Sequence, residues 1–289
     1  MTAPSASLLE GGFFWRRHRS TVLLLATALP AIIFLLVFYI APMALLLAES
    51  LEGGTFKHYA KALSDGLYVG VLIDTLVIAA CVSLVCLLLG YPLAYFLAST
   101  PAPWPTIGII FVLLPFWTSI LVRTYGWMIL LGRNGIVNRA LIELGLIATP
   151  LPLLNNINGV LIGMVHVLLP YMVFPIYAVM LRIDRDLAAA ASGLGAPPWR
   201  VFTRIYFPLT LPGAFAGSVL VFVIALGFFI TPAILGGGRV ITIGLLIEQQ
   251  VRQFLDWPFA AALSALLLAA ALLIQGTFQR VLRGETRWH

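Results

Sequence analysis

Two ionisable side chains stand inside long apolar stretches of this sequence, the carboxylate of Asp74 and the guanidinium of Arg123. Charges within a membrane-spanning segment are costly and by default mark a binding site or a conduction path. At about 1.5 Å per helical residue, both fall near the outer membrane face and would be level with each other. Three interpretations stay open: Asp74 lines the outer path and attracts an ammonium group, the two charges form a structural ion pair, or Arg123 extends to lipid headgroups.

Aromatic side chains in the third and fifth apolar stretches offer a second kind of chemistry, because ring faces attract ammonium ions. Rings near the ends of a span more often anchor it at the membrane surface, so both interpretations stay open. The aromatic members of this candidate cation–π path are Trp117, Tyr125, Trp127, Phe228 and Phe229.

Motifs of catalysis and nucleotide binding are absent from the sequence. It has no Gly-x-x-x-x-Gly-Lys-Ser/Thr phosphate loop, no His-Glu-x-x-His zinc site and no Gly-x-Ser-x-Gly nucleophile. His166 is the only histidine inside an apolar stretch, and we interpret it as a buried, hydrogen-bonded side chain. We therefore expect no enzyme activity, no catalytic residues, and no metal or cofactor bound by this chain.

The elements that position these residues are six apolar runs. Of the 289 residues, 61% are apolar and 10% are charged, whereas soluble domains carry about 25% charged residues. A helix needs about 20 apolar residues to cross the bilayer, and irregular backbone facing lipid is not tolerated there. We predict an all-α integral membrane protein with six transmembrane helices, at residues 22–47, 69–97, 106–131, 159–181, 213–235 and 257–281. Gly213 and Gly217, four residues apart, are predicted to pack against another helix.

Positive charge is distributed unequally between the two ends of these helices. One end carries ten basic residues: Arg16, Arg17, Arg19, Arg182, Arg185, Arg200, Arg204, Arg280, Arg283 and Arg287. The other end carries six basic and six acidic residues. The positive-inside rule places the first end, with both chain termini, in the cytoplasm. The basic pI of about 9.6 follows from this bias, and we expect no nucleic-acid partner because no soluble basic stripe is present.

The segment 182–212, between the fourth and fifth runs, has the pattern of two short helices. Asp184 is placed to cap a helix start, and residues 187–191 are strong helix formers. Gly195 suits the end of that helix, and Pro198 suits the first turn of the next. Pro208 and Pro212 are expected to break the chain before the fifth span. Two short helices at the cytoplasmic surface predict a docking element.

This segment resembles the EAA loop of the permease subunits of ATP-binding cassette (ABC) importers. That pattern is Glu-Ala-Ala, three residues, Gly, nine residues, and Ile-x-Leu-Pro. The present sequence has Ala189-Ala190-Ala191, then Gly195, then Ile205-Tyr206-Phe207-Pro208. Ala189 replaces the glutamate and Phe207 replaces the leucine, and the missing glutamate puts the usual charged contact in doubt.

The resemblance extends from about Pro30 to Val281 and is closest to the polyamine (spermidine/putrescine) permeases. Permeases for opines, phosphonates and other small amines share the same features. The stretches that carry it are Leu-Gly-Tyr-Pro-Leu-Ala at 89–94, Pro-Phe-Trp-Thr at 115–118, Arg-Thr-Tyr-Gly at 123–126, Leu-Leu-Pro-Tyr-Met-Val at 168–173 and Asp-Trp-Pro-Phe at 256–259.

The resemblance implies a type I ABC importer permease fold with a cytoplasmic coupling helix in the bacterial inner membrane. It divides the chain into a cytoplasmic segment 1–19, a permease domain 20–284 and a cytoplasmic tail 285–289. The chain would form half of a path for a small cationic solute, by alternating access. Implied partners are a second permease, non-identical because of the missing glutamate, two ATPase subunits that bind ATP and Mg²⁺, and a periplasmic binding protein.

The same resemblance assigns the residues that would contact the ATPase. They are Asp184, Leu187, Ala189, Ala190, Ala191, Leu194, Gly195, Ala196, Trp199, Ile205 and Pro208. We hypothesise that apolar docking by Leu187, Leu194 and Trp199 compensates for the missing glutamate. The alternative function is an ATP-independent secondary transporter or channel. Such a protein would carry polar groups at the membrane midplane and internal inverted repeats, and neither feature is evident in the sequence.

Overall fold

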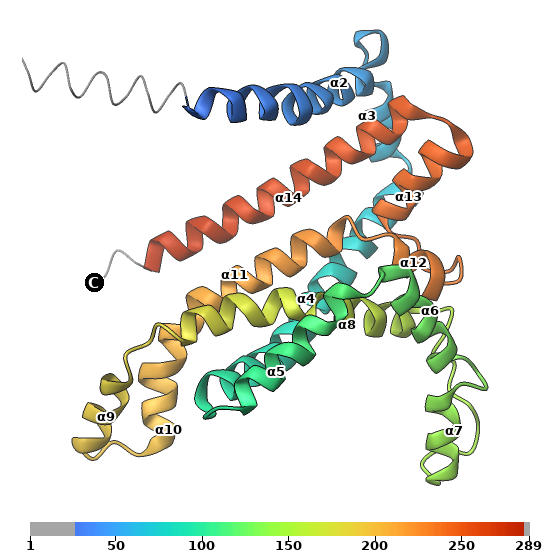
Figure 1. Cartoon of the computed structure of the whole chain (residues 1–289). Coiled ribbons are helices and arrows are strands. Elements are labelled where there is room, and N and C mark those ends of the chain that lie inside the picture. The colour runs from blue at the N-terminus through green and yellow to red at the C-terminus, as the bar shows by residue number, and fades with distance from the viewer. Residues whose placement is uncertain (1–26, 286–289) are drawn as a thin grey trace, which may run out of the picture.

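The computed structural model of the protein describes residues 27–285, and its regular elements over this range are helices (Figure 1). Five helices in this range are long and apolar enough to cross a membrane: Thr27–Glu49, Gly66–Ser99, Ile157–Met180, Pro198–Leu226 and Trp257–Thr277. A sixth span is a pair of segments, Trp104–Trp117 and Ile120–Glu143, which meet at 101°. The predicted all-α membrane fold is therefore confirmed, with five spans, or six when this bent pair is counted as one span. The predicted segment 1–19 and the tail after residue 285 lie outside the described residues.

Several short helices connect or extend these spans. In chain order the helices are α2 (Ala41–Ser50), α3 (Lys57–Ser64), α4 (Gly66–Ser99), α5 (Trp104–Leu113), α6 (Ile120–Leu131), α7 (Ile136–Glu143), α8 (Ile157–Met180), α9 (Arg185–Gly193), α10 (Pro198–Val201), α11 (Phe207–Leu226), α12 (Ile230–Leu235), α13 (Ile243–Gln249) and α14 (Trp257–Glu285).

The core of the bundle is α8, which packs against both α4 and α11. Val160, Met164, Leu168, Met172 and Ile176 recur every four residues along α8, and all five are buried. Side chains at this spacing lie on one helix face. Lipid is as apolar as these side chains, so the three helices are held by close packing rather than by exclusion of water.

Glycines allow α11 to approach α8 closely. A Cβ atom added at Gly213 would lie 2.9 Å from the carbonyl oxygen of Pro175, and one added at Gly217 would lie 3.0 Å from that of Met172. At both positions an added side chain would press on the α8 backbone at 3.0 Å or less, so the two helices would have to move apart. The prediction that Gly213 and Gly217 pack against another helix is therefore confirmed.

The third apolar run is broken, although the sequence predicts one continuous helix over 106–131. α5 passes into a 3-10 turn, Leu114–Trp117, and the backbone is extended at Thr118 and Ser119 before α6 begins. Pro115 has no N–H to continue the α-helical ladder, and the hydroxyl of Thr118 donates to the Pro115 carbonyl at 3.0 Å. The run therefore forms two segments with a sharp turn within the span.

The fifth apolar run also differs from its prediction. The helix begins at Pro198 and continues through a π-helical turn, Phe202–Tyr206, into α11, so Pro208 and Pro212 do not break it. Pro208 lies in the first turn of α11, directly after the wider π turn, where a missing N–H is tolerated. At the other end, α11 stops at Leu226 and α12 is a separate short helix, so residues 213–235 are not one span.

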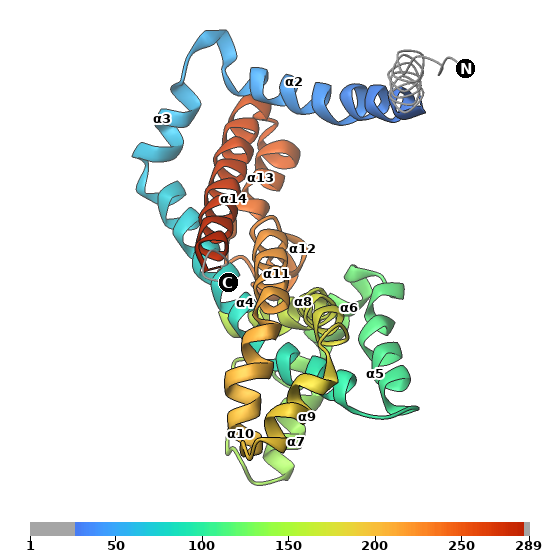
Figure 2. The same cartoon turned by 90° about the vertical axis from the view of Figure 1, so that its left-hand side faces the viewer.

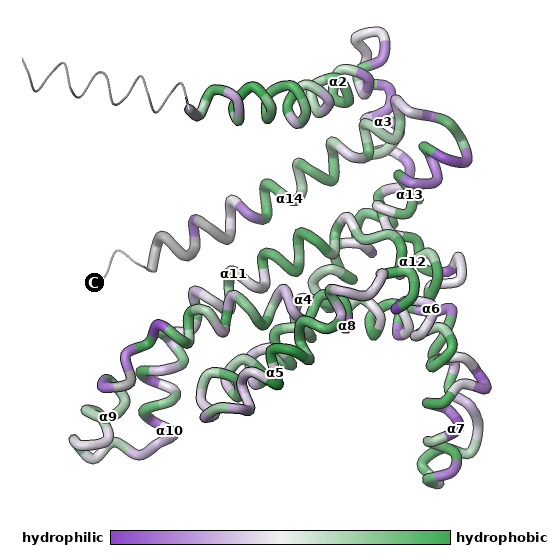
Figure 3. The backbone as a smooth tube through the Cα atoms, viewed as in Figure 1, coloured by the Kyte–Doolittle hydropathy of each residue, from purple (hydrophilic) through white to green (hydrophobic). Residues whose placement is uncertain are grey.

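The first helix stands apart from this core. In both views α2 projects away from α4, α8 and α11, while α3 and the start of α14 meet near its end (Figures 1 and 2). Apolar side chains along Thr27–Glu49 are exposed within this chain. Figure 3 shows that this helix is apolar along its length, whereas hydrophilic residues gather in α3, in α7 and around α9 and α10.

A buried amide fixes the segment that follows α6. The Nδ2 of Asn138 donates to the carbonyls of Gly132 (3.1 Å) and Leu151 (3.0 Å), and its Oδ1 accepts from the Leu151 N–H (2.8 Å). All three bonds join parts of one hairpin around α7.

We expect Asn138→Leu to destabilise this hairpin locally by about 1–3 kcal/mol, because it removes three hydrogen bonds made by a buried amide to the backbone of Gly132 and Leu151. Amide hydrogen exchange over residues 132–151 should become faster, with α8 unchanged. The exposed neighbour Asn134 makes none of these bonds, so Asn134→Leu serves as the control. Equal acceleration in the two variants would contradict the role of the Asn138 amide.

Candidate coupling loop and translocation path

The loop between α8 and α11 is a helix, a tight turn and a second helix, at one pole of the molecule (Figure 1). The Asp184 carboxylate caps α9 by accepting the Asp186 N–H at 2.9 Å. At the other end Gly195 has φ +83°, a left-handed conformation that glycine adopts without strain. The N–H of Gly195 donates to the Ser192 carbonyl, and that of Ala196 donates to the Ala191 carbonyl. These two bonds form a Schellman motif, which reverses the chain in a fixed geometry.

Large apolar side chains cover the outer surface of this turn. Leu194 is 91% exposed, Trp199 63% and Leu187 48%. Ala189 and Ala190 on α9 are exposed beside them, and Gly195 is exposed at the turn itself. The structure thus brings these predicted coupling residues onto one small protruding unit, in which the side chain at the usual glutamate position carries no charge.

Part of the predicted coupling set also connects this unit to the spans. Ile205, Leu187 and Asp184 line a cavity of about 300 Å³, whose other walls are the ends of α4 and α8. Pro208 is exposed at the start of α11. Because α10 continues through the π turn into α11, the loop and the core are joined by one continuous helix.

A polar cavity lies at the opposite end of the core, about 360 Å³ in volume. Its polar lining residues are Asp74 from α4, Asn155 and Asn156 before α8, and Arg239 after α12. The Asn155 N–H donates to the Leu235 carbonyl at 2.9 Å, and this bond joins two of the walls. Sequence reasoning singled out only Asp74, since the other three occupy loops and become neighbours only through the fold.

A second hydrogen bond fixes the α4 wall of the same cavity. The hydroxyl of Thr75, the residue after Asp74, accepts the N–H of Ile243 at 2.8 Å, in a fully buried position. Thr75 also donates to the Val71 carbonyl at 2.6 Å, so its hydroxyl is satisfied on both sides. The cavity walls from α4 and from the start of α13 are therefore held together.

Asp74 and Arg123 lie at different depths, contrary to the expectation that they are level. Asp74 shares a cavity with Asn156, which is the N-cap of α8. Arg123 instead lies in the chain between Phe116, whose ring contacts that of Tyr171 on α8, and Trp127, whose indole N–H donates to His166 on α8. His166 and Tyr171 lie roughly 15 and 22 Å along α8 from Asn156, at about 1.5 Å per residue. Neither Asp74 nor Arg123 takes part in an ion pair among the described residues.

The candidate aromatic residues do not form one cluster within this chain. Trp127 faces α8, where its indole N–H donates to Nδ1 of His166 at 3.1 Å. Trp117 and Tyr125 are exposed, the former at 86%, on the outer surface of the broken span. Phe228 and Phe229 lie at the break between α11 and α12. The cation–π contacts found in residues 27–285 involve Lys61 and Arg200 rather than these rings.

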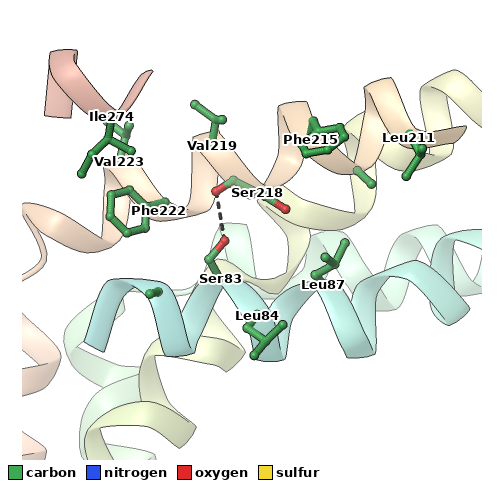
Figure 4. A pocket seen from close by; sticks show the side chains of 12 residues that line it. Ser83, Leu84, Leu87, Leu211, Phe215, Ser218, Val219, Phe222, Val223 and Ile274 are labelled. Carbon is green, nitrogen blue, oxygen red and sulfur yellow. Dashed lines mark hydrogen bonds between the residues drawn. The ribbon is translucent and has the colours of Figure 1, made fainter. Parts of the chain in front are cut away.

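An apolar cavity of about 450 Å³ is lined by α4 and α11, with Ile274 of α14 at its edge (Figure 4). Its only polar side chains are Ser83 and Ser218, and the Ser83 hydroxyl donates to the Ser218 carbonyl at 3.0 Å. Such a surface suits hydrocarbon and holds no group that would bind a charged solute.

A helical membrane core with a sharply bent third apolar run and a protruding helix–turn–helix at one pole matches the type I ABC importer permease fold. The chain belongs to the family described as binding-protein-dependent transport system inner membrane component, whose family model matches residues 6–284. The predicted family is thereby confirmed, and it is a family of transport permeases rather than of enzymes.

The chain is also similar in sequence to individual named permeases. The chain is 40% identical over 231 residues to the spermidine/putrescine transport system permease protein PotB of Salmonella typhimurium (strain LT2), covering 79% of this chain and 80% of that protein. It is 37% identical to PotB of Haemophilus influenzae, with 84% and 90% covered. The predicted similarity to polyamine permeases is therefore also confirmed.

A solved structure agrees with the fold. A chain of the bacterial alginate ABC transporter, in complex with an alginate pentasaccharide-bound periplasmic protein, superposes with a TM-score of 0.74. The match covers 94% of this chain and 98% of that chain at 22% identity. At this identity the likeness concerns the fold alone.

Proposed function

We propose that this chain is one of two permease subunits of an ATP-driven importer for a small polyamine such as putrescine or spermidine. The observation that carries the solute class is the 40% identity to spermidine/putrescine permeases over most of both chains. Import would proceed by alternating access, driven by separate ATPase subunits that bind ATP and Mg²⁺. A periplasmic binding protein would deliver the solute to the outward-facing state.

The loop of α9 and α10 is the contact with the ATPase in this proposal. Its exposed Leu187, Leu194 and Trp199 supply an apolar surface for a groove on the partner, and they compensate for the alanine at position 189. Burying three such side chains stabilises a contact by several kcal/mol, before the cost of association is subtracted. The loop pole then faces the cytoplasm, together with the termini, and the cavity of Asp74 faces the periplasm.

A second, non-identical permease subunit completes the path. The apolar helix Thr27–Glu49 is exposed along its length and stands apart from the core of its own chain, which leaves it available to a neighbouring subunit. The broken span adds the exposed Trp117 and Tyr125 to the unpaired apolar surface. In the assembled importer these aromatic side chains would border the path of the solute.

Asp74 is the proposed acceptor for an ammonium group at the outer end of the path. We expect Asp74→Asn to raise the solute concentration for half-maximal uptake about tenfold, which corresponds to roughly 1.4 kcal/mol for one charge-assisted hydrogen bond. Initial rates of putrescine uptake into proteoliposomes measure this. Glu143→Gln removes an exposed carboxylate from α7, outside the cavity, and should leave uptake unchanged. Unaltered kinetics in Asp74→Asn would remove Asp74 from the path.

The function is tested by reconstituting the chain with its second permease, ATPase subunits and binding protein in liposomes. ATP hydrolysis is then measured with putrescine, spermidine, other amines, amino acids and phosphonates. Stimulation by polyamines alone is expected. Stimulation by another solute would retain the importer and discard the polyamine. A complex that transports without any ATPase subunit would favour a secondary transporter.

A further inference from the structure

The guanidinium of Arg123 has no hydrogen-bond partner among the described residues. Its Nε atom is buried, yet it donates to no acceptor, and Arg123 is absent from the ion pairs found in residues 27–285. An arginine has five N–H donors and remains charged in proteins. Burying such a group without compensation costs several kcal/mol, so a native membrane protein supplies a partner.

Arg123 lies too deep for lipid headgroups to be that partner. Its chain neighbours Phe116 and Trp127 contact Tyr171 and His166, which stand near the middle of α8. The 24 residues of α8 span roughly 36 Å, which places Arg123 about 15 Å from either end. An extended arginine side chain reaches only about half that distance. Its Nε also lies buried, rather than facing lipid.

No acid whose side chain the structure describes lies at that depth. The eleven acidic residues are Glu10, Glu49, Glu52, Asp65, Asp74, Glu143, Asp184, Asp186, Glu248, Asp256 and Glu285. Asp74 is the only one well inside an apolar run, and it lies at the outer end of the core with Asn156. A second copy of the same chain would bring the same acids and would not provide the missing charge.

Arg123 lies beside a surface that this chain leaves uncovered. Val122 and Tyr125 on α6 are 66% and 51% exposed, and Trp117 precedes them on the same broken span. Arg123 itself is half-buried. It lies between this exposed surface of α6 and the face of the helix on which Thr124 is buried against the core. A group that covers the exposed face of α6 therefore reaches the guanidinium from the side opposite α8.

We propose that Arg123 forms an ion pair, across the interface between the two permease subunits, with a carboxylate that the other subunit carries at mid-membrane depth. A carboxylate matches the planar fork of the guanidinium with two parallel hydrogen bonds, whereas acyl chains offer no acceptor. The inference rests on the proposed function in one respect, namely the positive charge of the solute. A polyamine would be repelled by Arg123, so the solute is not the partner of Arg123. The pair fixes the register of the two subunits and neutralises a positive charge beside a path for cations.

The test uses the complete importer, with both permease chains, the ATPase subunits and the binding protein. Arg123→Leu should lower the yield of co-purified second permease at least tenfold, and Arg123→Lys should restore part of it. Each carboxylate in the spans of the second permease is then changed to its amide. One of these changes should disrupt assembly with the wild-type chain and rescue assembly with Arg123→Leu. Arg139→Leu, at an exposed position on α7, is the control and should assemble normally.

The outcomes separate this inference from the proposed function. The ion pair is overturned if the Arg123→Leu chain assembles normally and no carboxylate of the second permease affects assembly. If polyamine uptake continues in that case, the proposed function is unaffected. Arg123-dependent stimulation of ATP hydrolysis by 2-aminoethylphosphonate would make Arg123 a site for the anionic end of a solute, which overturns both. If the Arg123→Leu chain fails to fold, the amide changes in the second permease decide, because they leave this chain unaltered. Loss of assembly from one of them supports the pair, and loss from none overturns it.

Discussion

Replacing Gly195 with valine is expected to weaken the proposed contact with the ATPase, and so to lower the stimulated rate of ATP hydrolysis, while leaving the transmembrane core folded. Gly195 holds φ +83° at the turn between α9 and α10, a conformation that costs a β-branched residue about 2 kcal/mol. No neighbouring atom lies within 4 Å of a Cβ placed there, so the penalty comes from the backbone alone. It disfavours the turn that presents Leu194 and Trp199 together. A loss of 2 kcal/mol corresponds to a roughly 30-fold weaker contact with the ATPase.

Two variants isolate the backbone conformation as the cause. Asparagine tolerates the left-handed region, so Gly195→Asn should retain most of the activity. Gly193, two residues earlier, lies within α9 and has equally open surroundings, so Gly193→Val adds the same side chain without the strain. The measurement is ATP hydrolysis stimulated by the loaded binding protein, with co-purification of the ATPase. Full activity in Gly195→Val would show that the turn does not control coupling.

Replacing Gly213 with leucine is expected to prevent the core from packing. A Cβ at this position would lie 2.9 Å from the Pro175 carbonyl oxygen and 3.0 Å from the Cα of Ile176, both in the backbone of α8. Backbone atoms cannot rotate away as a side chain can, so α11 must separate from α8. Overpacking of this kind costs about 3 kcal/mol, or more than a hundredfold in the folding equilibrium. The thermal midpoint of the purified chain in detergent should fall, with loss of the monodisperse form.

The matched control for this prediction is Gly70→Leu. Gly70 is also a helical glycine, in α4, but an added Cβ there meets no atom within 4 Å. The same increase in volume should therefore be tolerated. Comparable thermal midpoints for the two leucine variants would mean that α8 and α11 are not held by this close approach.

Local patterns predicted much of the coupling loop and the number of spans. Asp184, Gly195 and Pro198 act through their own backbone neighbourhoods, as a cap, a left-handed turn and a helix start, so their positions could be inferred without the rest of the chain. Apolar run length similarly predicted the spans, because the thickness of the bilayer sets a length that a single segment must meet.

Breaks inside the apolar runs were the main errors. The third run bends at Thr118 and the fifth ends at Leu226, although both continue to be apolar beyond these points. The length of an apolar run reflects the free energy of transferring the segment into lipid. This free energy is nearly the same for a straight and a bent segment, so run length does not predict a bend. Proline was no reliable guide, since Pro115 accompanies a break, whereas Pro212 lies inside a helix.

The sequence by itself determined that this protein resides in a membrane and that it contains a loop resembling the EAA loop of ABC importer permeases, since composition and short motifs are local properties. Only the tertiary structure decided which charges are neighbours. It places Asp74 with Asn155, Asn156 and Arg239 at the end of the core opposite the loop, and it leaves Arg123 near the middle of the core without a hydrogen-bond partner among residues 27–285. Helix depth and rotation depend on packing between distant segments, such as Gly213 on Pro175, and no single segment contains that information.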